Sequence, residues 1–152
     1  MKRILIYIIV LLALTKAPLE GVHLGMLRPV EVVMILREGN EVVILTDTED
    51  MGRGEDGLAA LENLKATTPG NIYLDTAEYL LLTADTEAVA EQLRSKLRSS
   101  VGLCTADKGI DLQLVAKYLP AHDKLPALKA WKQGEKLPYL KTVGERLQLV
   151  KS

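Results

Sequence analysis

The chain has 152 residues, a length that suits a single domain. Its hydrophobic fraction of 48% and its charged fraction of 26% are ordinary for a globular protein and exclude an intrinsically disordered one. The net charge of −1 lacks the basic excess of a nucleic-acid-binding protein, so we expect no nucleic-acid partner.

An apolar run from Ile4 to Leu14 follows Lys2 and Arg3 near the N-terminus. A short positive region before such a run is typical of an export signal. As a helix the run would be roughly 16 Å long, about half of the ~30 Å hydrocarbon core of a bilayer. We therefore interpret residues 1–20 as a signal peptide or membrane anchor. The small-x-small pattern Ala13-Leu14-Thr15 is a poor cleavage site, so cleavage and retention both remain open.

Residues 27–120 are predicted to form an α+β core domain with a small mixed sheet and about three helices. Strand-like runs from Val30 to Leu36 and from Val42 to Thr46 flank Gly39-Asn40, a pair that favours a β-hairpin turn. The two strands should therefore pair antiparallel. A polar loop, Asp47 to Gly54, is expected to follow them.

The rest of the core alternates between helical and extended patterns. A first helix is expected to start at Glu55-Asp56 and to bury Leu58, Leu61 and Leu64, because their spacing places them on one face. Asp85 or Thr86 should cap a second helix, and a third should end at Pro120. The apolar residues of the second helix are Val89, Leu93 and Leu97, and those of the third are Leu112, Val115, Ala116 and Leu119. The extended segments between the helices are 72–74, 79–82 and 101–105.

Residues 121–152 are interpreted as a peripheral C-terminal tail, because Pro and Gly recur along them. A short helical pattern runs from Leu125 to Trp131. Near the end, Leu147 and Leu149 alternate with polar residues, which is typical of an edge strand.

The sequence contains one motif that suggests nucleotide binding, Gly52-x-Gly54-x-x-Gly57, between a strand and a helix. Glu55 and Asp56 would repel a phosphate at the start of that helix. We therefore interpret the motif as a solvated loop and assign no cofactor-binding residue and no cofactor.

The sequence also contains no recognisable metal-binding motif. The loop acids could offer oxygen ligands to Ca²⁺, but they lack the spacing of a calcium-binding loop. His23 and His122 are far apart and have no metal-ligand motif around them. We assign no metal ligand. The loop acids are Asp47, Glu49, Asp50, Glu55 and Asp56.

No constellation of catalytic residues is apparent. Cys104, the single cysteine, lies in a predicted strand where a buried packing role is expected. Asp75 and Glu78 have the residue types of an acid and base pair, but nothing in the sequence predicts a cleft around them. We assign no catalytic residue and expect the protein not to be an enzyme.

Four segments form a recognisable pattern: the export signal, Leu27 to Val33, Gly57 to Leu64, and Tyr73 to Leu82, with a strand and helix unit from Val101 to Leu119 following them. This pattern resembles the N-terminal domain of Ger(x)C-type spore germination proteins, the C subunits of germinant receptors, and short related proteins of spore-forming Firmicutes. Two departures from that family are clear. Thr15-Lys16 stands where family members usually carry a lipid-accepting cysteine, and family members are about twice as long. The resemblance implies a non-enzymatic envelope protein.

The sequence thus predicts an extracytoplasmic protein on the outer face of the cell membrane, held there by its N-terminal segment. It would act by contact with other envelope proteins, and the resemblance implies a role in spore germination or sporulation. Two alternatives remain. One is a small extracytoplasmic ligand-binding domain that uses Asp47 to Gly54 as a lid. The other is a cytosolic α/β enzyme in which Ile4 to Val10 is a buried central strand.

Overall fold

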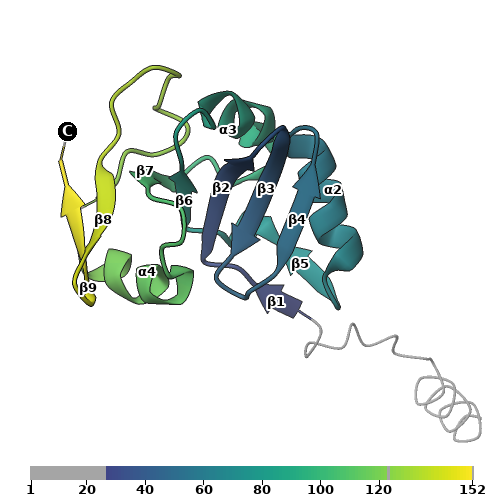
Figure 1. The fold of residues 1–152 in the computed structure, drawn as a ribbon, viewed down its shortest axis with the longest axis horizontal. Helices are drawn as coiled ribbons and strands as arrows, with labels where there is room; N and C mark the ends of the chain where they lie inside the picture. The colour runs from purple at the N-terminus through teal and green to yellow at the C-terminus, as the bar shows by residue number, and fades with distance from the viewer. Residues whose placement is uncertain (1–26, 123, 152) are drawn as a thin grey trace, which may run out of the picture.

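The computed structural model describes residues 27–122 and 124–151 (Figure 1). The expected signal or anchor at 1–20, the alternative strand at 4–10, and His23 lie outside the described residues. Within them the chain forms a seven-stranded mixed sheet in the order β4-β3-β2-β6-β7-β8-β9, together with three α-helices. The expected α+β class with a mixed sheet and about three helices is confirmed. A separate parallel pair joins β1 (Leu27–Pro29) to β5 (Asn71–Tyr73).

The predicted hairpin forms one end of the sheet. β2 (Val32–Glu38) and β3 (Glu41–Thr46) pair antiparallel, as predicted. Gly39 has a φ of 61° in the turn between them. Residues that carry a side chain rarely adopt this left-handed backbone conformation, so a glycine suits the position.

β4 (Met51–Gly54) extends the hairpin by one more antiparallel strand. The prediction of a polar loop from Asp47 to Gly54 is therefore wrong for its last four residues. Two of these four residues are glycines, which are depleted in strands and leave no alternating hydrophobic pattern. Packing against the following helix places this segment in the sheet.

The centre of the sheet is parallel. β2, β6 (Tyr79–Leu82), β7 (Gly102–Ala106) and β8 (Tyr139–Val143) run in one direction. The side chains of β6 are buried on both faces, and Leu80, Leu81 and Leu82 each have an exposed fraction of 0%. This continuous burial explains why an unbroken apolar run forms a central strand.

Helices cover both faces of the sheet. α2 (Gly57–Thr67) and α3 (Glu87–Leu93) pack on the face that carries Val33 and Ile35. α4 (Leu112–Tyr118) packs on the opposite face, which carries Met34. Figure 1 shows α2 behind β3 and β4 and α4 at the lower end of the sheet. Three short 3-10 turns, Leu74–Thr76, Arg94–Lys96 and Leu119–Ala121, complete these connections.

The helix ends agree in part with the sequence prediction. Asp56 caps α2 by accepting a hydrogen bond from the N–H of Ala59. Thr86 is the residue before α3, whereas Asp85 lies outside that helix with a φ of 64°. Leu58, expected in the core, is 44% exposed. The buried face of α2 is formed instead by Gly57, Ala60, Leu61 and Leu64.

The chain beyond residue 120 contributes to the core. Leu128 and Leu140 are fully buried, and Trp131 is 2% exposed. No helix forms over 125–131, so that prediction is wrong. Ala127 instead forms an antiparallel bridge with Gly102 at the start of β7, and Leu128 N–H bonds to the carbonyl of Val101 at 2.8 Å. Strand hydrogen bonding to β7 thus replaces the helical bonds that the local pattern favours.

β9 (Arg146–Val150) pairs antiparallel with β8 and ends the sheet. The predicted edge strand around Leu147 and Leu149 is confirmed. β8 itself was not predicted, although its Leu140 belongs to the buried cluster beneath α4.

Candidate functional site

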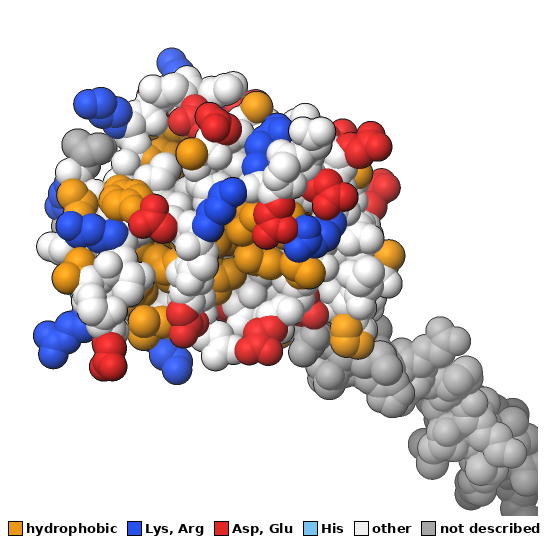
Figure 2. All heavy atoms as spheres, viewed as in Figure 1, with side chains coloured by type: hydrophobic (Ala, Val, Ile, Leu, Met, Phe, Trp, Pro, Cys, Tyr) orange, Lys and Arg blue, Asp and Glu red, His pale blue; other side chains and the backbone are white. Residues whose placement is uncertain are grey.

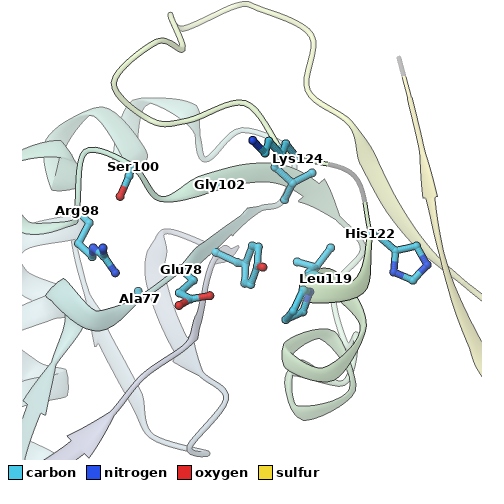
Figure 3. Close-up of a pocket in the computed structure, with 11 residues that line it drawn as sticks. Ala77, Glu78, Arg98, Ser100, Gly102, Leu119, His122 and Lys124 are labelled. Carbon is cyan, nitrogen blue, oxygen red and sulfur yellow. The ribbon is translucent and has the colours of Figure 1, made fainter.

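A hollow of about 400 Å³ lies where β6 and β7 begin. Figure 3 shows the arrangement of its side chains, with Arg98 extending toward the segment that carries Glu78. Gly102 forms part of the wall, and a Cβ atom there would lie 3.0 Å from the Cβ of Leu125. The polar residues that line the hollow are Glu78, Tyr79, Arg98, Ser100, His122 and Lys124.

The charges of this hollow are mixed. Within the described part of the chain, neither Arg98 nor Lys124 makes a side-chain hydrogen bond or ion pair, and both are exposed. Burial raises the pKa of Tyr79, and the negative charges of Glu78 and Glu31 raise it further. The Tyr79 hydroxyl therefore stays protonated at neutral pH and can donate a hydrogen bond. A hollow lined by Glu78, Arg98 and Lys124 suits small polar molecules that carry a positive and a negative charge.

His122 is one of the residues that line this hollow, but its ring is turned away from it. Its ring stacks on Tyr118 with 3.7 Å between the ring centroids, and its Nδ1 lies 2.7 Å from the carbonyl oxygen of Tyr118. A carbonyl only accepts, so Nδ1 carries the proton of that hydrogen bond. In Figure 3 the ring points away from the labelled side chains of the hollow.

The carboxylates weighed as an acid and base pair do not share a site. Glu78 lines the hollow described above, whereas Asp75 lines a different one with Lys65 and Lys96. Asp75 belongs to the 3-10 turn Leu74–Thr76, whereas Glu78 immediately precedes β6.

The glycine motif has a packing role in this fold. Gly52 and Gly54 lie in β4, where α2 approaches closely. A Cβ atom would lie 2.2 Å from the carbonyl oxygen of Ala60 at the first position and 2.3 Å from its nitrogen at the second. A Cβ atom on Gly57 would lie 2.7 Å from Cγ1 of Val89. The solvated loop expected here is a strand, and its glycines allow strand and helix backbones to meet.

The predicted acidic cluster is divided by β4. Asp47 accepts hydrogen bonds from the N–H groups of Glu31 and Val32 at 3.1 Å each. Glu49 accepts from the side chain of Gln113. Asp56 lies at the other end of β4, where it caps α2. These carboxylates accept hydrogen bonds that stabilise a turn, a helix start and a contact with α4. The described residues contain no group of three acidic, His or Cys side chains placed to bind a metal ion.

Cys104 is a packing residue in β7, as expected. Its exposed fraction is 0%, and burial raises its pKa to about 12. A thiol reacts as its thiolate, so this side chain is inert at neutral pH.

The two edges of the sheet differ in how their backbone groups are satisfied. At β4, side chains of α2 cover the edge. Arg53 N–H donates to Oδ1 of Asn63 at 2.9 Å, and Thr67 Oγ1 donates to the carbonyl of Met51 at 3.4 Å. At β9, the described residues form one hydrogen bond of this kind, from Leu149 N–H to the hydroxyl of Tyr118 at 3.3 Å. The β9 edge is therefore the less protected one.

Apolar side chains are exposed beside the β9 edge. Val143 is 52% exposed and Val150 is 38% exposed on the β8 and β9 hairpin. The face of the molecule seen in Figure 2 carries acidic and basic side chains interspersed around a band of hydrophobic ones. This face offers no patch of a single charge to nucleic acid. No residue of the hairpin edge was singled out from the sequence beyond Leu147 and Leu149, since strand pairing partners are not visible in a local pattern.

None of the helices among the described residues has the length and apolar character needed to cross a bilayer. The chain matches no protein-family model, and no curated protein or solved structure shows significant similarity to it.

Proposed function

We propose that this chain is a non-enzymatic, membrane-associated protein on the outer face of a bacterial cell membrane that acts by contact with other envelope proteins. Spore germination or sporulation is the process to which the resemblance with Ger(x)C-type proteins assigns it. The N-terminal run from Ile4 to Leu14 after two basic residues supports the location.

The single structural observation that carries the contact role is the β8 and β9 hairpin. It forms the less protected edge of the sheet, and Val143 and Val150 on it are 52% and 38% exposed. Exposed apolar side chains beside an open strand edge favour association with another chain. These two exposed valines thus lie at the end of the sheet opposite β4.

Cell fractionation with an antibody against the folded body, combined with N-terminal sequencing, tests the location. The protein is expected in the membrane fraction and accessible to added protease in protoplasts. As a control, substituting Ile8 and Leu12 by Asp should move the protein to the soluble fraction. A soluble cytosolic wild-type product that retains Met1 would contradict the proposal.

A ligand-binding role is the second candidate, and the hollow lined by Glu78, Arg98 and Lys124 favours it. Its mixed charges suit a small zwitterionic molecule. Titration with a panel of free amino acids and related zwitterions, read as a shift in melting temperature, tests this role. An effect that survives the double substitution Arg98→Ala and Lys124→Ala would exclude this hollow as the site.

A further inference from the structure

We propose that β9 pairs antiparallel with β9 of a second copy of this chain, which joins the two seven-stranded sheets across a two-fold axis. This inference rests on the proposed function, because it names the partner of a domain that acts by protein contact. The partner is a second copy because the strand can pair with itself in a register that joins opposite charges.

The direction of each backbone group of β9 follows from its pairing with β8. Val143 faces Arg146 across the Gly144-Glu145 turn, so alternate residues from Arg146 onward bond to β8. Leu147 and Leu149 lie between them and direct their N–H and C=O groups away from the sheet. The hydrogen bond from Leu149 N–H to Tyr118, which lies outside the sheet, agrees with this alternation.

The outward groups of β9 are not all satisfied. Among the described residues, the N–H and C=O of Leu147 and the C=O of Leu149 have no partner in the β8 ladder or in α4. Tyr118 takes the remaining outward N–H through a long hydrogen bond of 3.3 Å, which a second strand can replace. A second strand would therefore meet backbone groups that already point toward it.

Two copies of β9 can pair through these outward residues in three registers. Leu147 can face Leu147, Leu149 can face Leu149, or Leu147 can face Leu149 of the second copy. In the third register Glu145 lies across from Lys151 of the second copy, and Arg146 lies across from Val150. This register alone pairs opposite charges, and it sets no like charges face to face.

The pairing is compatible with a membrane tether. Its two-fold axis runs perpendicular to the joined sheets, so two copies held by one membrane would lie with their sheets parallel to it. About 12 residues lie between Leu14 and Leu27, and a chain of that length reaches up to ~40 Å when extended.

A cysteine at the two-fold axis tests the pairing. In the proposed register Gln148 faces Gln148 of the second copy in a non-hydrogen-bonded pair, with Cα atoms about 4.5 Å apart. That separation is within the range that a disulfide spans, about 4.4–6.8 Å. Arg146→Cys is the matched control, because it is exposed on the same face of β9 but would lie about 13 Å from its copy. The wild-type chain supplies the background, since its single Cys104 is buried.

Full-length Gln148→Cys should give a disulfide-linked dimer on mild oxidation with copper phenanthroline, at a yield at least five times that of Arg146→Cys. Three results would overturn the pairing. These are equal yields from both variants, a cross-link of Gln148→Cys to a protein of different mass, and no cross-link from a Gln148→Cys chain that melts at the wild-type temperature.

A charge swap provides a second measurement. Glu145→Lys in the Gln148→Cys background should lower the cross-linking yield two- to five-fold, and adding Lys151→Glu should restore it. An unchanged yield in the single charge variant would overturn the register. Membrane and soluble fractions are oxidised separately. A dimer found only in the soluble fraction refutes the membrane location and leaves the pairing standing, whereas a membrane-bound monomer refutes the pairing alone.

Discussion

The hydroxyl of Tyr118 in α4 accepts a hydrogen bond from the backbone N–H of Leu149 in β9, with 3.3 Å between oxygen and nitrogen. The ring that carries this hydroxyl stacks on His122. The end of α4 thus occupies one backbone position at the sheet edge. Satisfying this amide stabilises the single chain, and the same contact competes with any strand that pairs with β9.

Replacing Tyr118 by Phe should therefore have two opposite effects. The ring and its stacking remain, but the acceptor for Leu149 N–H is lost. The free energy of unfolding should fall by about 0.5–1.5 kcal/mol, while the cross-linking yield of Gln148→Cys should rise. Urea unfolding at low protein concentration and oxidative cross-linking measure the two effects. Tyr73→Phe is the control, since Tyr73 is exposed and its hydroxyl makes no hydrogen bond to the described residues; an equal loss of stability in that variant would contradict the assignment.

The close approach of β4 to α2 makes Gly54 intolerant of a side chain. In Gly54→Ala the new Cβ would lie 2.3 Å from the nitrogen of Ala60, and backbone atoms cannot rotate away as a side chain does. We expect a loss of about 2–4 kcal/mol in the free energy of unfolding. Gly134→Ala is the control. That glycine has a φ of 90° but nothing within 4 Å of the position of an added Cβ. Gly134→Ala should therefore lower the free energy of unfolding by only ~1 kcal/mol. Chemical denaturation followed by circular dichroism compares them, and equal losses would mean that contact with α2 is not the cause.

Arg94 fixes the segment that replaces the predicted helix. Its guanidinium donates to the carbonyls of Leu128 and Trp131, the latter at 3.0 Å, and lies 5.7 Å from the Trp131 ring centroid. Arg94→Met keeps the apolar stem but leaves both carbonyls without this donor, so stability should fall by about 2 kcal/mol. The emission of Trp131, the single tryptophan, should shift to longer wavelength.

Arg98→Met is the matched control for that variant. Arg98 is exposed and has no side-chain partner among the described residues, so its substitution should change stability by less than about 0.5 kcal/mol. If Arg98→Met were as costly as Arg94→Met, loss of positive charge rather than loss of the carbonyl contacts would explain both.

Cys104 should make stability fall at alkaline pH. Its pKa is raised from 9.0 to about 12 by burial, so the folded state retains the thiol proton where the unfolded state has lost it. Below pH 9 both states hold the proton and the contribution is complete; it is lost as the pH rises from 9 toward 12. Between pH 8 and pH 10 the wild-type chain should therefore lose about 1.4 kcal/mol more than Cys104→Ala. Parallel pH dependences would show that the thiol is not shielded in the folded chain.

The sequence predicted the elements whose hydrogen bonds are local or whose faces are strongly patterned. Gly39-Asn40 specifies a tight turn by itself, and Asp56 specifies a helix start because a cap acts within one turn. The apolar run of β6 could likewise be recognised, since both of its faces are buried.

The elements that were missed depend on distant partners. β4 is a strand because Ala60 and Leu64 of α2 fit against Gly52, which no local pattern reveals. Residues 125–131 have a helical pattern, yet the start of β7 and the side chain of Arg94 bond to their backbone instead. The same limit applies to the candidate hollow, because Glu78, Arg98 and Lys124 come together only when strands β6 and β7 pair.

Asn63 and Thr67, which bond to the outer backbone of β4, also limit how large an assembly can become. A chain with two open strand edges can add copies without end and grow into a fibre, whereas a chain with one can add only a single neighbour. Growth through the proposed β9 pairing would therefore stop at two copies. Two polar side chains of α2, which bond to β4 at the end of the sheet opposite β9, would therefore prevent open-ended polymerisation.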